Sequence, residues 1–251
     1  MAWQVPKTDW AAADGVRDTD LNRIEGNILE LYNIALIHNA VTVYVSPSGN
    51  DSTGDGTSAR PYKTITKALQ AIPRNLNGDT ATISIAAGTY NERPVIKGFN
   101  GPLRLSLASS VSIKSLTVDG CVVLHTGSML TLAPTSTGAT GLLIQNGATW
   151  VSLADITVSA GAKGIAVQYG SKMSASGIVN IHDTTAIGLD VRSASMADIY
   201  NIKGTGNALA IASSGGSIIS YALMSISGTT RTFTTDGGRI YSGAQISVAS
   251  Y

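Results

Sequence analysis

Four aspartates in the second half of the chain could support acid–base chemistry: Asp155, Asp183, Asp190 and Asp198. A glycoside hydrolase needs two carboxyl groups about 5–9.5 Å apart, one on each side of the bond to be cut. Asp155 and Asp198 occur in "SLADI" and "SMADI", and two turns of a coiled β-structure would place them on one edge, roughly 9.6 Å apart. The same sequence suits a corner at which Asp accepts backbone hydrogen bonds, and we favour the corner.

A second polar group contains His182, Asp183, Asp190 and Arg192. Asp190 and Arg192 alternate on one expected strand, which predicts an exposed ion pair of small energetic value. We interpret His182 as a surface residue. The sequence has no Cys/His cluster, Ser-His-Asp arrangement or phosphate loop, and Cys121 is its single cysteine. We therefore expect no cofactor, no metal site and a function that is not catalytic, with a polysaccharide hydrolase or lyase as the alternative.

The stretch "NDSTGDGTSARPYKTITKAL", residues 50–69, supports two interpretations. Asp51 and Asp55 have the spacing that opens a calcium loop, but the twelfth position is Tyr62, where such a loop needs a bidentate Glu. The second half places apolar residues on one face of a short helix over 63–72. We favour a loop followed by a helix that covers the end of a larger domain.

Composition excludes several functions. The net charge of +1 gives no basic surface for nucleic acid. No apolar run approaches the roughly 18 residues of a membrane span, so we expect no membrane insertion. The sequence "MAWQVPKTDW" lacks the basic start and apolar core of a signal peptide. Only 13% of residues are charged, and Gly, Ser, Thr and Ala are abundant, which favours a β-rich protein with many tight corners.

An internal repeat extends through the second half of the chain. "GLLIQNGATW", "GIAVQYGSKM", "GLDVRSASM" and "ALAIASSGGSI" follow one another at steps of 23, 24 and 20 residues. Such a unit fits one coil of a parallel β-helix, whose inward residues form continuous apolar columns. The expected columns are Leu142, Ile165, Leu189 and Leu209; Ile144, Val167, Val191 and Ile211; and the larger Trp150, Met173, Met196 and Ile218.

The repeat and its flanks define four segments. We predict an N-terminal segment with a helix at 1–40, a first strand, loop and capping helix at 41–79, parallel β-helix coils at 80–228, and a terminal coil or β cap at 229–251. Within the first segment, Leu21, Ile24, Ile28 and Leu31 follow heptad spacing. Two alternatives fit this stripe: a helix packed on its own domain, or a helix that meets copies of itself at an oligomer axis.

Two stretches resemble known families. "VYVSPSGND", "PYKTI" and "KAL" resemble the first segment of pectate-lyase-like right-handed β-helix proteins, which include pectinolytic enzymes, epimerases, adhesins and phage tailspikes. "WQVPKTDW" and "DLNRIEGNI" resemble the opening of tail and baseplate-proximal fibre proteins from phages and prophages of Gram-positive bacteria. The first resemblance implies an all-β, right-handed parallel β-helix; fold alone does not imply an activity.

The second resemblance implies a phage or prophage tail appendage. Its N-terminus, with Trp3, Pro6 and Trp10, would attach to tail or baseplate proteins, and a homotrimer would pack the heptad stripe near its axis. The protein would be assembled in the host cytoplasm, reside in the virion tail and present its β-helix to host-surface polysaccharide. Candidate platforms for stacking sugar rings are Tyr169, Tyr200, Tyr221 and Tyr241. The alternative is a tailspike-like depolymerase of capsule or cell-wall glycan.

Overall fold

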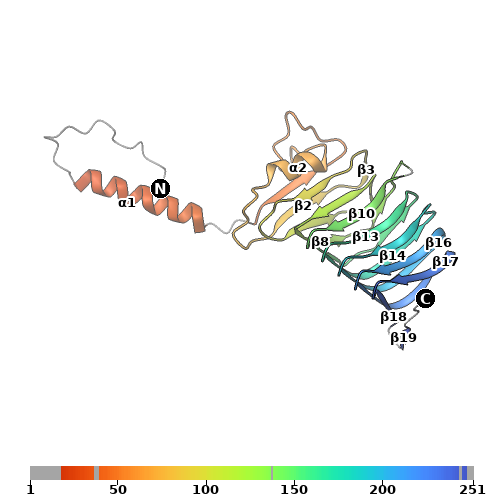
Figure 1. Ribbon diagram of the computed structural model, residues 1–251. Coiled ribbons are helices and arrows are strands. Elements are labelled where there is room, and N and C mark those ends of the chain that lie inside the picture. The colour runs from red at the N-terminus through yellow and green to blue at the C-terminus, as the bar shows by residue number, and fades with distance from the viewer. Residues whose placement is uncertain (1–17, 37–39, 137, 243–244, 248–251) are drawn as a thin grey trace. The chain divides into compact units, whose positions relative to one another are not determined.

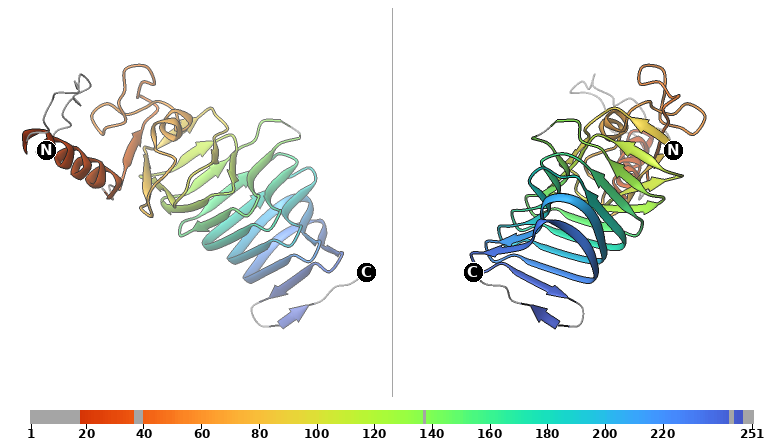
Figure 2. Two further views of the ribbon diagram at one scale, coloured as in Figure 1. Left: turned by 60° about the vertical axis from the view of Figure 1, so that its left-hand side comes forward. Right: turned by 90° about the vertical axis from the view of Figure 1, so that its right-hand side faces the viewer.

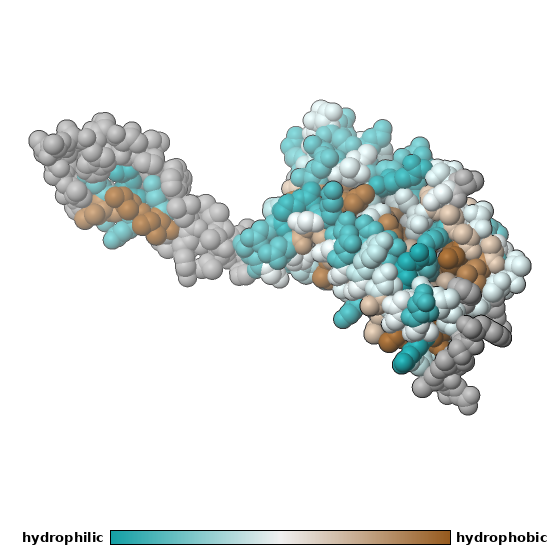
Figure 3. Space-filling model, viewed as in Figure 1, coloured by the Kyte–Doolittle hydropathy of each residue, from teal (hydrophilic) through white to brown (hydrophobic). Residues whose placement is uncertain are grey.

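The computed structural model describes residues 18–36, 40–136, 138–242 and 245–247, and the chain forms two compact units, 1–39 and 40–251. The first contains helix α1 (Asp18–Leu36), as the heptad spacing predicts. Leu21, Ile24 and Ile28 are 51%, 44% and 59% exposed, and they belong to an apolar patch on α1 (Figure 3). The expected attachment residues Trp3, Pro6 and Trp10 and the side chain of Leu31 lie outside what the structure describes. No helix among the described residues could cross a membrane.

The second unit is a parallel β-solenoid of about seven coils. Figures 1 and 2 show each coil stacked on the previous one, and the strands of the coils pair with their counterparts one coil away. All strand pairs of the described residues are parallel except the last, between β18 (Arg239–Ser242) and β19 (Gln245–Ser247). The predicted parallel β-helix is thus confirmed, and its ladders form three sheets.

The first sheet begins before the coils and extends to the end of the solenoid. Its strands are β1 (Thr42–Val45), β2 (Ala81–Ile85), β5 (Leu103–Leu107), β8 (Val122–Gly127), β11 (Thr149–Ser152), the first parts of β14 (Lys172–His182), β16 (Met196–Ser214) and β17 (Ile218–Thr235), and β18. The last three long strands bend from one sheet into the next without interruption.

The other two sheets complete each coil. The second sheet contains β3 (Gly88–Tyr90), β6 (Val111–Ile113), β9 (Leu130–Leu132), β12 (Ile156–Ser159) and later parts of β14, β16 and β17. The third sheet contains β4 (Val95–Lys97), β7 (Leu116–Asp119), β10 (Thr140–Gln145), β13 (Lys163–Val167), β15 (Ile187–Val191) and the ends of β16 and β17. Side chains alternate between the interior and the outside along the strands, as the burial of β2 and β5 shows.

Apolar columns fill the interior, with one residue from each coil. Leu142, Ile165 and Leu189 are register partners, as predicted, but the next partner is Ile211, so the assignment of Leu209 was wrong by two residues. A shift of two residues keeps every side chain on the same face of a strand, so the alternation pattern alone could not detect it. The neighbouring column differs from the prediction by the same two residues. It contains Ile144, Val167, Val191 and then Ser213 in place of the predicted Ile211.

The column of large side chains in the first sheet also differs from the prediction. Trp150 and Met173 are buried partners, but the next partner is Ala197. Met196 precedes it in the strand and is exposed, because adjacent side chains point to opposite faces. Ile218 pairs with Met196 and was misassigned by the same single residue. The exposed Met196 was thus mistaken for a core residue because its side chain is large and apolar.

Helix α2 (Ile65–Ala71) follows the long loop after β1, slightly shorter than the helix predicted over 63–72. Ile65, Ala68 and Leu69 are buried in the same apolar cluster as the first coils. Thr64 caps the helix by accepting a hydrogen bond from Lys67 N. Glu92 accepts hydrogen bonds from Ile65 N at 2.7 Å and Thr66 N at 2.9 Å, which ties the first turn of α2 to the first coil.

Two buried polar residues, His125 and Ser152, interrupt an apolar column of the first sheet. His125 and Ser152 occupy the column that Leu105 and Ala175 fill in neighbouring coils. His125 Nδ1 lies 2.7 Å from Ser152 Oγ, and Nε2 lies 3.1 Å from the carbonyl oxygen of Ser128. Burial lowers the pKa of His125 to about 4, so the ring is neutral at pH 7. The carbonyl oxygen of Ser128 can only accept, which favours a proton on Nε2. The Ser152 hydroxyl also lies 2.8 Å from the carbonyl oxygen of Ala154, so its single proton is shared between that oxygen and Nδ1.

Candidate binding site

The two Ala-Asp-Ile aspartates do not form a pair. Asp155 precedes β12 at a corner, where its carboxylate accepts a hydrogen bond from Ile178 N at 2.7 Å. Asp198 lies within the first sheet, in register with Ser174, and accepts from Ser220 Oγ at 2.8 Å. The corner interpretation is confirmed for Asp155. The expectation that both aspartates share one edge was wrong, because the matching tripeptides occupy different positions in their coils.

Asp190 differs from the exposed ion pair that we predicted. Asp190 is only 1% exposed, and its carboxylate contacts two cations on the outside of the third sheet. Lys163 Nζ lies 2.5 Å from Oδ2, while Arg192 donates from Nε to Oδ1 at 3.2 Å and pairs with Oδ2 through its terminal nitrogen. Strand alternation predicts the outward direction correctly, but it cannot show that the cations cover the carboxylate.

Asp183 lies immediately after β14 with a left-handed backbone, at φ 59°. His182 Nδ1 is 2.7 Å from its carboxylate, and both side chains are at least partly exposed. Asp183 also borders an open hollow of about 620 Å³, together with Gly206 and Asn207. Among the described residues, no group of three or more His, Cys, Asp or Glu side chains could hold a metal ion. The four candidate aspartates thus occupy separate positions around the coils.

The four tyrosines are also dispersed. Tyr169 is exposed at a corner, with a left-handed φ of 56°. Tyr200 is exposed on β16, while Tyr221 occupies an inward register position on β17 and packs partly against the core. Tyr241 lies on β18, where its hydroxyl accepts from Arg239 at 3.4 Å. Whether any of them contacts a glycan remains a prediction.

The loop after β1 uses its acidic side chains internally. Asp51 accepts hydrogen bonds from Lys63 N and Thr64 N at 2.7 and 3.0 Å, so it holds the start of α2 against the loop. Asp55 accepts from the backbone and hydroxyl of Thr57, and these bonds lower its pKa to about 2. It also pairs with Arg60. These contacts agree with a loop fixed by its own polar groups.

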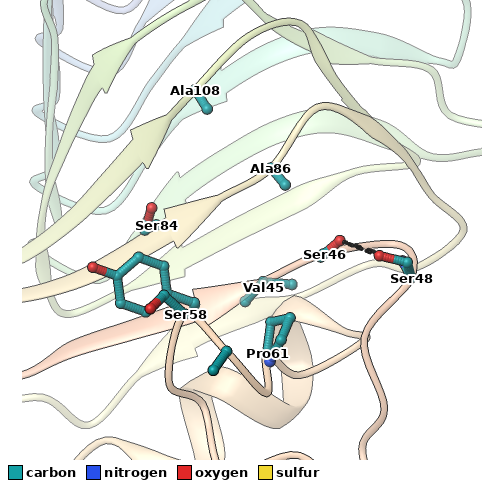
Figure 4. A pocket seen from close by; sticks show the side chains of 10 residues that line it. Val45, Ser46, Ser48, Ser58, Pro61, Ser84, Ala86 and Ala108 are labelled. Carbon is teal, nitrogen blue, oxygen red and sulfur yellow. Dashed lines mark hydrogen bonds between the residues drawn. The ribbon is translucent and has the colours of Figure 1, made fainter.

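A pocket lies where this loop meets the outer surface of the first sheet (Figure 4). Its volume is about 500 Å³, within the usual range for small-molecule sites. The end of β1 and the following turn form one part of the pocket. Ser58, Ala59 and Pro61 of the loop form another, and β2 with the residues after β2 and β5 forms the rest. Its lining is Tyr44, Val45, Ser46, Ser48, Ser58, Ala59, Pro61, Ser84, Ala86 and Ala108.

The pocket presents hydroxyl groups without formal charge. All ten lining residues are uncharged. Ser46 Oγ and Ser48 Oγ share a hydrogen bond of 2.9 Å, drawn in Figure 4, and each keeps further hydrogen-bonding capacity. Within the described part of the chain, the hydroxyls of Ser58 and Ser84 bond no protein group. Tyr44, 36% exposed, adds an aromatic ring beside them.

The backbone around the pocket is firmly held. Tyr44 N donates to Gly56 O at 2.8 Å, and Tyr62 N donates to Tyr44 O at 3.0 Å, so the loop pairs with β1. From the interior, the hydroxyl of Tyr90 donates to Ala86 O at 2.8 Å. Burial raises the pKa of Tyr90 to about 12, so this donor keeps its proton. The pocket is therefore formed by the fold itself.

Sequence reasoning did not identify this site. The alternation in "VTVYVS" correctly places Val43 and Val45 inside and Tyr44 outside. What was missed is that Ser58 and Pro61 return to the same face as Ser84. That juxtaposition depends on how the loop folds, for which the repeat pattern carries no information.

A family described as "Protein of unknown function (DUF1565)" matches residues 47–240. The chain belongs to the DUF1565 family. The DUF1565 match includes the loop, α2 and the coils up to the middle of β18, while α1 and β1 precede it. No curated protein and no solved structure matches the chain. Most of the pocket thus comes from the DUF1565 region, and Tyr44, Val45 and Ser46 come from the residues just before it.

Proposed function

We propose that this protein is a phage or prophage tail appendage whose β-solenoid binds a glycan of the host surface without cleaving it. The uncharged, hydroxyl-lined pocket beside β1 is the observation that carries the binding part of the proposal. Serine hydroxyls both donate and accept hydrogen bonds, as sugar hydroxyls do, and an aromatic ring suits the apolar face of a sugar. None of the ten lining residues offers a carboxyl group for acid–base catalysis.

The remaining parts of the proposal concern assembly. We infer a right-handed solenoid with α2 covering its N-terminal end, an attachment segment in residues 1–40, and a homotrimer. The exposed stripe of Leu21, Ile24 and Ile28 supports self-association through α1, because heptad-spaced apolar residues are buried when helices pair. Partners would be tail or baseplate proteins at one end and host polysaccharide at the other. The sequence resemblance of residues 3–28 supports the location in a virion tail.

A combined binding and cleavage assay tests this function. Purified protein of known solution mass is incubated with capsule and cell-wall polysaccharides from several Gram-positive hosts. Sedimentation with the polysaccharide measures binding, while assays for new reducing ends and unsaturated sugars measure cleavage. Binding without products supports the proposal. Absence of binding to every polysaccharide contradicts it, and product formation favours the depolymerase.

The depolymerase remains the second candidate because of one observation, the Asp183 carboxylate beside the open hollow of about 620 Å³. Asp183 and its partner His182, at 2.7 Å, form one acid–base pair, which suits a lyase rather than a hydrolase that needs two carboxyl groups. If the protein cleaves glycan, Asp183→Asn should abolish product release while binding in the pocket beside β1 persists. Asp155→Asn, at a corner, is the matched carboxylate control and should leave the rate unchanged.

A further inference from the structure

On the basis of this proposed function, we infer that the pocket beside β1 selects an uncharged sugar residue and discriminates against acidic sugars. The ligand class follows from the lining, in which four serines and Tyr44 supply the polar groups and the other five residues are apolar. Hydroxyl groups satisfy sugar hydroxyls in either hydrogen-bonding direction. A carboxylate or phosphate would find no cationic side chain among the ten lining residues.

Two cationic residues of this part of the chain, Arg60 and Lys63, are not among the lining residues. Arg60 lies between lining residues Ala59 and Pro61 but pairs with Asp55. Lys63 borders the neighbouring small cavity, where Glu92 is also part of the lining. A site discriminates against a ligand when it leaves a polar or charged group of that ligand without a partner. The carboxylate of an acidic sugar would lose water here without gaining a cationic side chain among the lining residues. Neutral sugars meet no such penalty.

The shape of the pocket fits a ring that lies against the sheet. Ala86 and Ala108 are small residues at the ends of neighbouring strands, so they leave space above the first sheet. Tyr44 lies one strand away from Ser84 in the same outward column, since the two are register partners. A bound ring can therefore contact the aromatic side chain and a free hydroxyl together, an arrangement that matches the mixed apolar and polar faces of sugars.

The pocket should bind with little ordering cost. Its loop is fixed by the hydrogen bonds of Asp51 and Asp55, and the Tyr90 hydroxyl supports Ala86 from the interior. A preformed site loses less conformational entropy when it binds than a flexible one. We therefore expect small, local changes on binding, confined to the loop, β1 and β2.

Titration of isotope-labelled protein, followed by nuclear magnetic resonance, tests this inference. The probes are glucose, galactose and N-acetylglucosamine, with short neutral oligosaccharides of each, and glucuronic acid as the acidic counterpart. At least one neutral probe should shift the amide signals of Tyr44 and Ser84 and bind at least tenfold more tightly than glucuronic acid.

Two pairs of variants locate the binding. Ser84→Ala should weaken binding of the neutral probe about three- to tenfold, whereas Ser106→Ala should not. Ser106 is the matched control, because it is the register partner of Ser84 in the next coil and lies outside the lining. Tyr44→Ala should weaken binding more than tenfold, and Val122→Ala, at an exposed apolar position of the first sheet outside the lining, should not. Thermal unfolding checks that each variant remains folded.

The outcomes separate this inference from the proposed function. If the protein sediments with host polysaccharide but Ser84→Ala and Tyr44→Ala bind it normally, the pocket is not the site, while glycan recognition stands. Equal affinity for glucuronic acid and the neutral probes overturns the selectivity. If no polysaccharide and no sugar probe binds, both the inference and the function are wrong. Selective, variant-sensitive binding supports both.

Discussion

His125 should make the solenoid less stable in mild acid. Its pKa is about 4 in the folded protein and about 6.5 in an unfolded chain, an interval of about 2.5 pH units. One pH unit corresponds to about 1.4 kcal/mol, so His125 should lower the free energy of unfolding by about 3 kcal/mol between pH 6.5 and pH 4. The sign follows from proton binding: within this interval the unfolded chain binds the proton and the folded protein does not. Stability is therefore complete above pH 6.5 and declines toward pH 4.

His125→Gln provides the test, because a glutamine side chain can bond Ser152 and Ser128 but does not titrate. Urea unfolding is measured between pH 4 and pH 8 for wild type and variant, and the difference in unfolding free energy is plotted against pH. The nearby Asp155 carboxylate favours the protonated ring and opposes the effect of burial, and it remains in both proteins. The contributions of the carboxylates to the pH dependence are common to both proteins, so they largely cancel when the two unfolding free energies are subtracted.

His182→Gln is the matched control, since this histidine is partly exposed beside Asp183. It removes an imidazole that is not buried, so comparison of the two variants isolates the effect of burial at His125. The reasoning is refuted if His125→Gln shows the same pH dependence as wild type, because then burial does not depress the pKa of the ring. It is also refuted if wild type is more stable at pH 4 than at pH 7.

Three further predictions concern charge, close packing and assembly. Asp190→Asn leaves two cations without their buried partner and should lower the free energy of unfolding by about 2 kcal/mol, measured by urea unfolding. An unchanged midpoint would show that this ion group does not stabilise the fold. Gly164→Ala adds a Cβ only 2.3 Å from a neighbouring side chain and should cost about 2 kcal/mol, whereas Gly138→Ala, with open space around it, should change stability by less than about 0.5 kcal/mol. Replacing Ile24 and Ile28 with Asp should lower the mass found by sedimentation equilibrium, and an unchanged mass would contradict association through α1.

The fold could be predicted from the sequence because its main signal is repeated in successive coils of the second half of the chain. Leu142, Ile165 and Leu189 recur at nearly constant spacing, and parallel pairing explains why each stacks on the next. The errors arose where local pattern was ambiguous. Period-two alternation cannot distinguish Leu209 from Ile211, and an exposed Met196 resembles a core residue when Ala197 actually fills the position.

The candidate sites were less predictable, because polar side chains act through partners that are distant in sequence. The corner role of Asp155 was recognisable from its own tripeptide. The burial of Asp190 was not, since it depends on Lys163 in the preceding coil. The pocket likewise requires residues from β1, the loop, β2 and the residues after β5. Composition shows only that hydroxyl-bearing residues are abundant, and does not show which of them converge.

The solenoid separates the residues that stabilise it from those that can recognise a ligand. Ile83 and Ser84 are adjacent on β2, yet Ile83 is fully buried in the core while Ser84 lines the pocket. Inward positions are constrained by the columns above and below them, since a change of volume creates a cavity or a clash. The outward side chain of Ser84 faces the pocket rather than a column, so it can change with the ligand. A coil that keeps Ile83 and varies Ser84 can therefore change its outer surface without losing its fold, which would suit the proposed recognition of surface glycans.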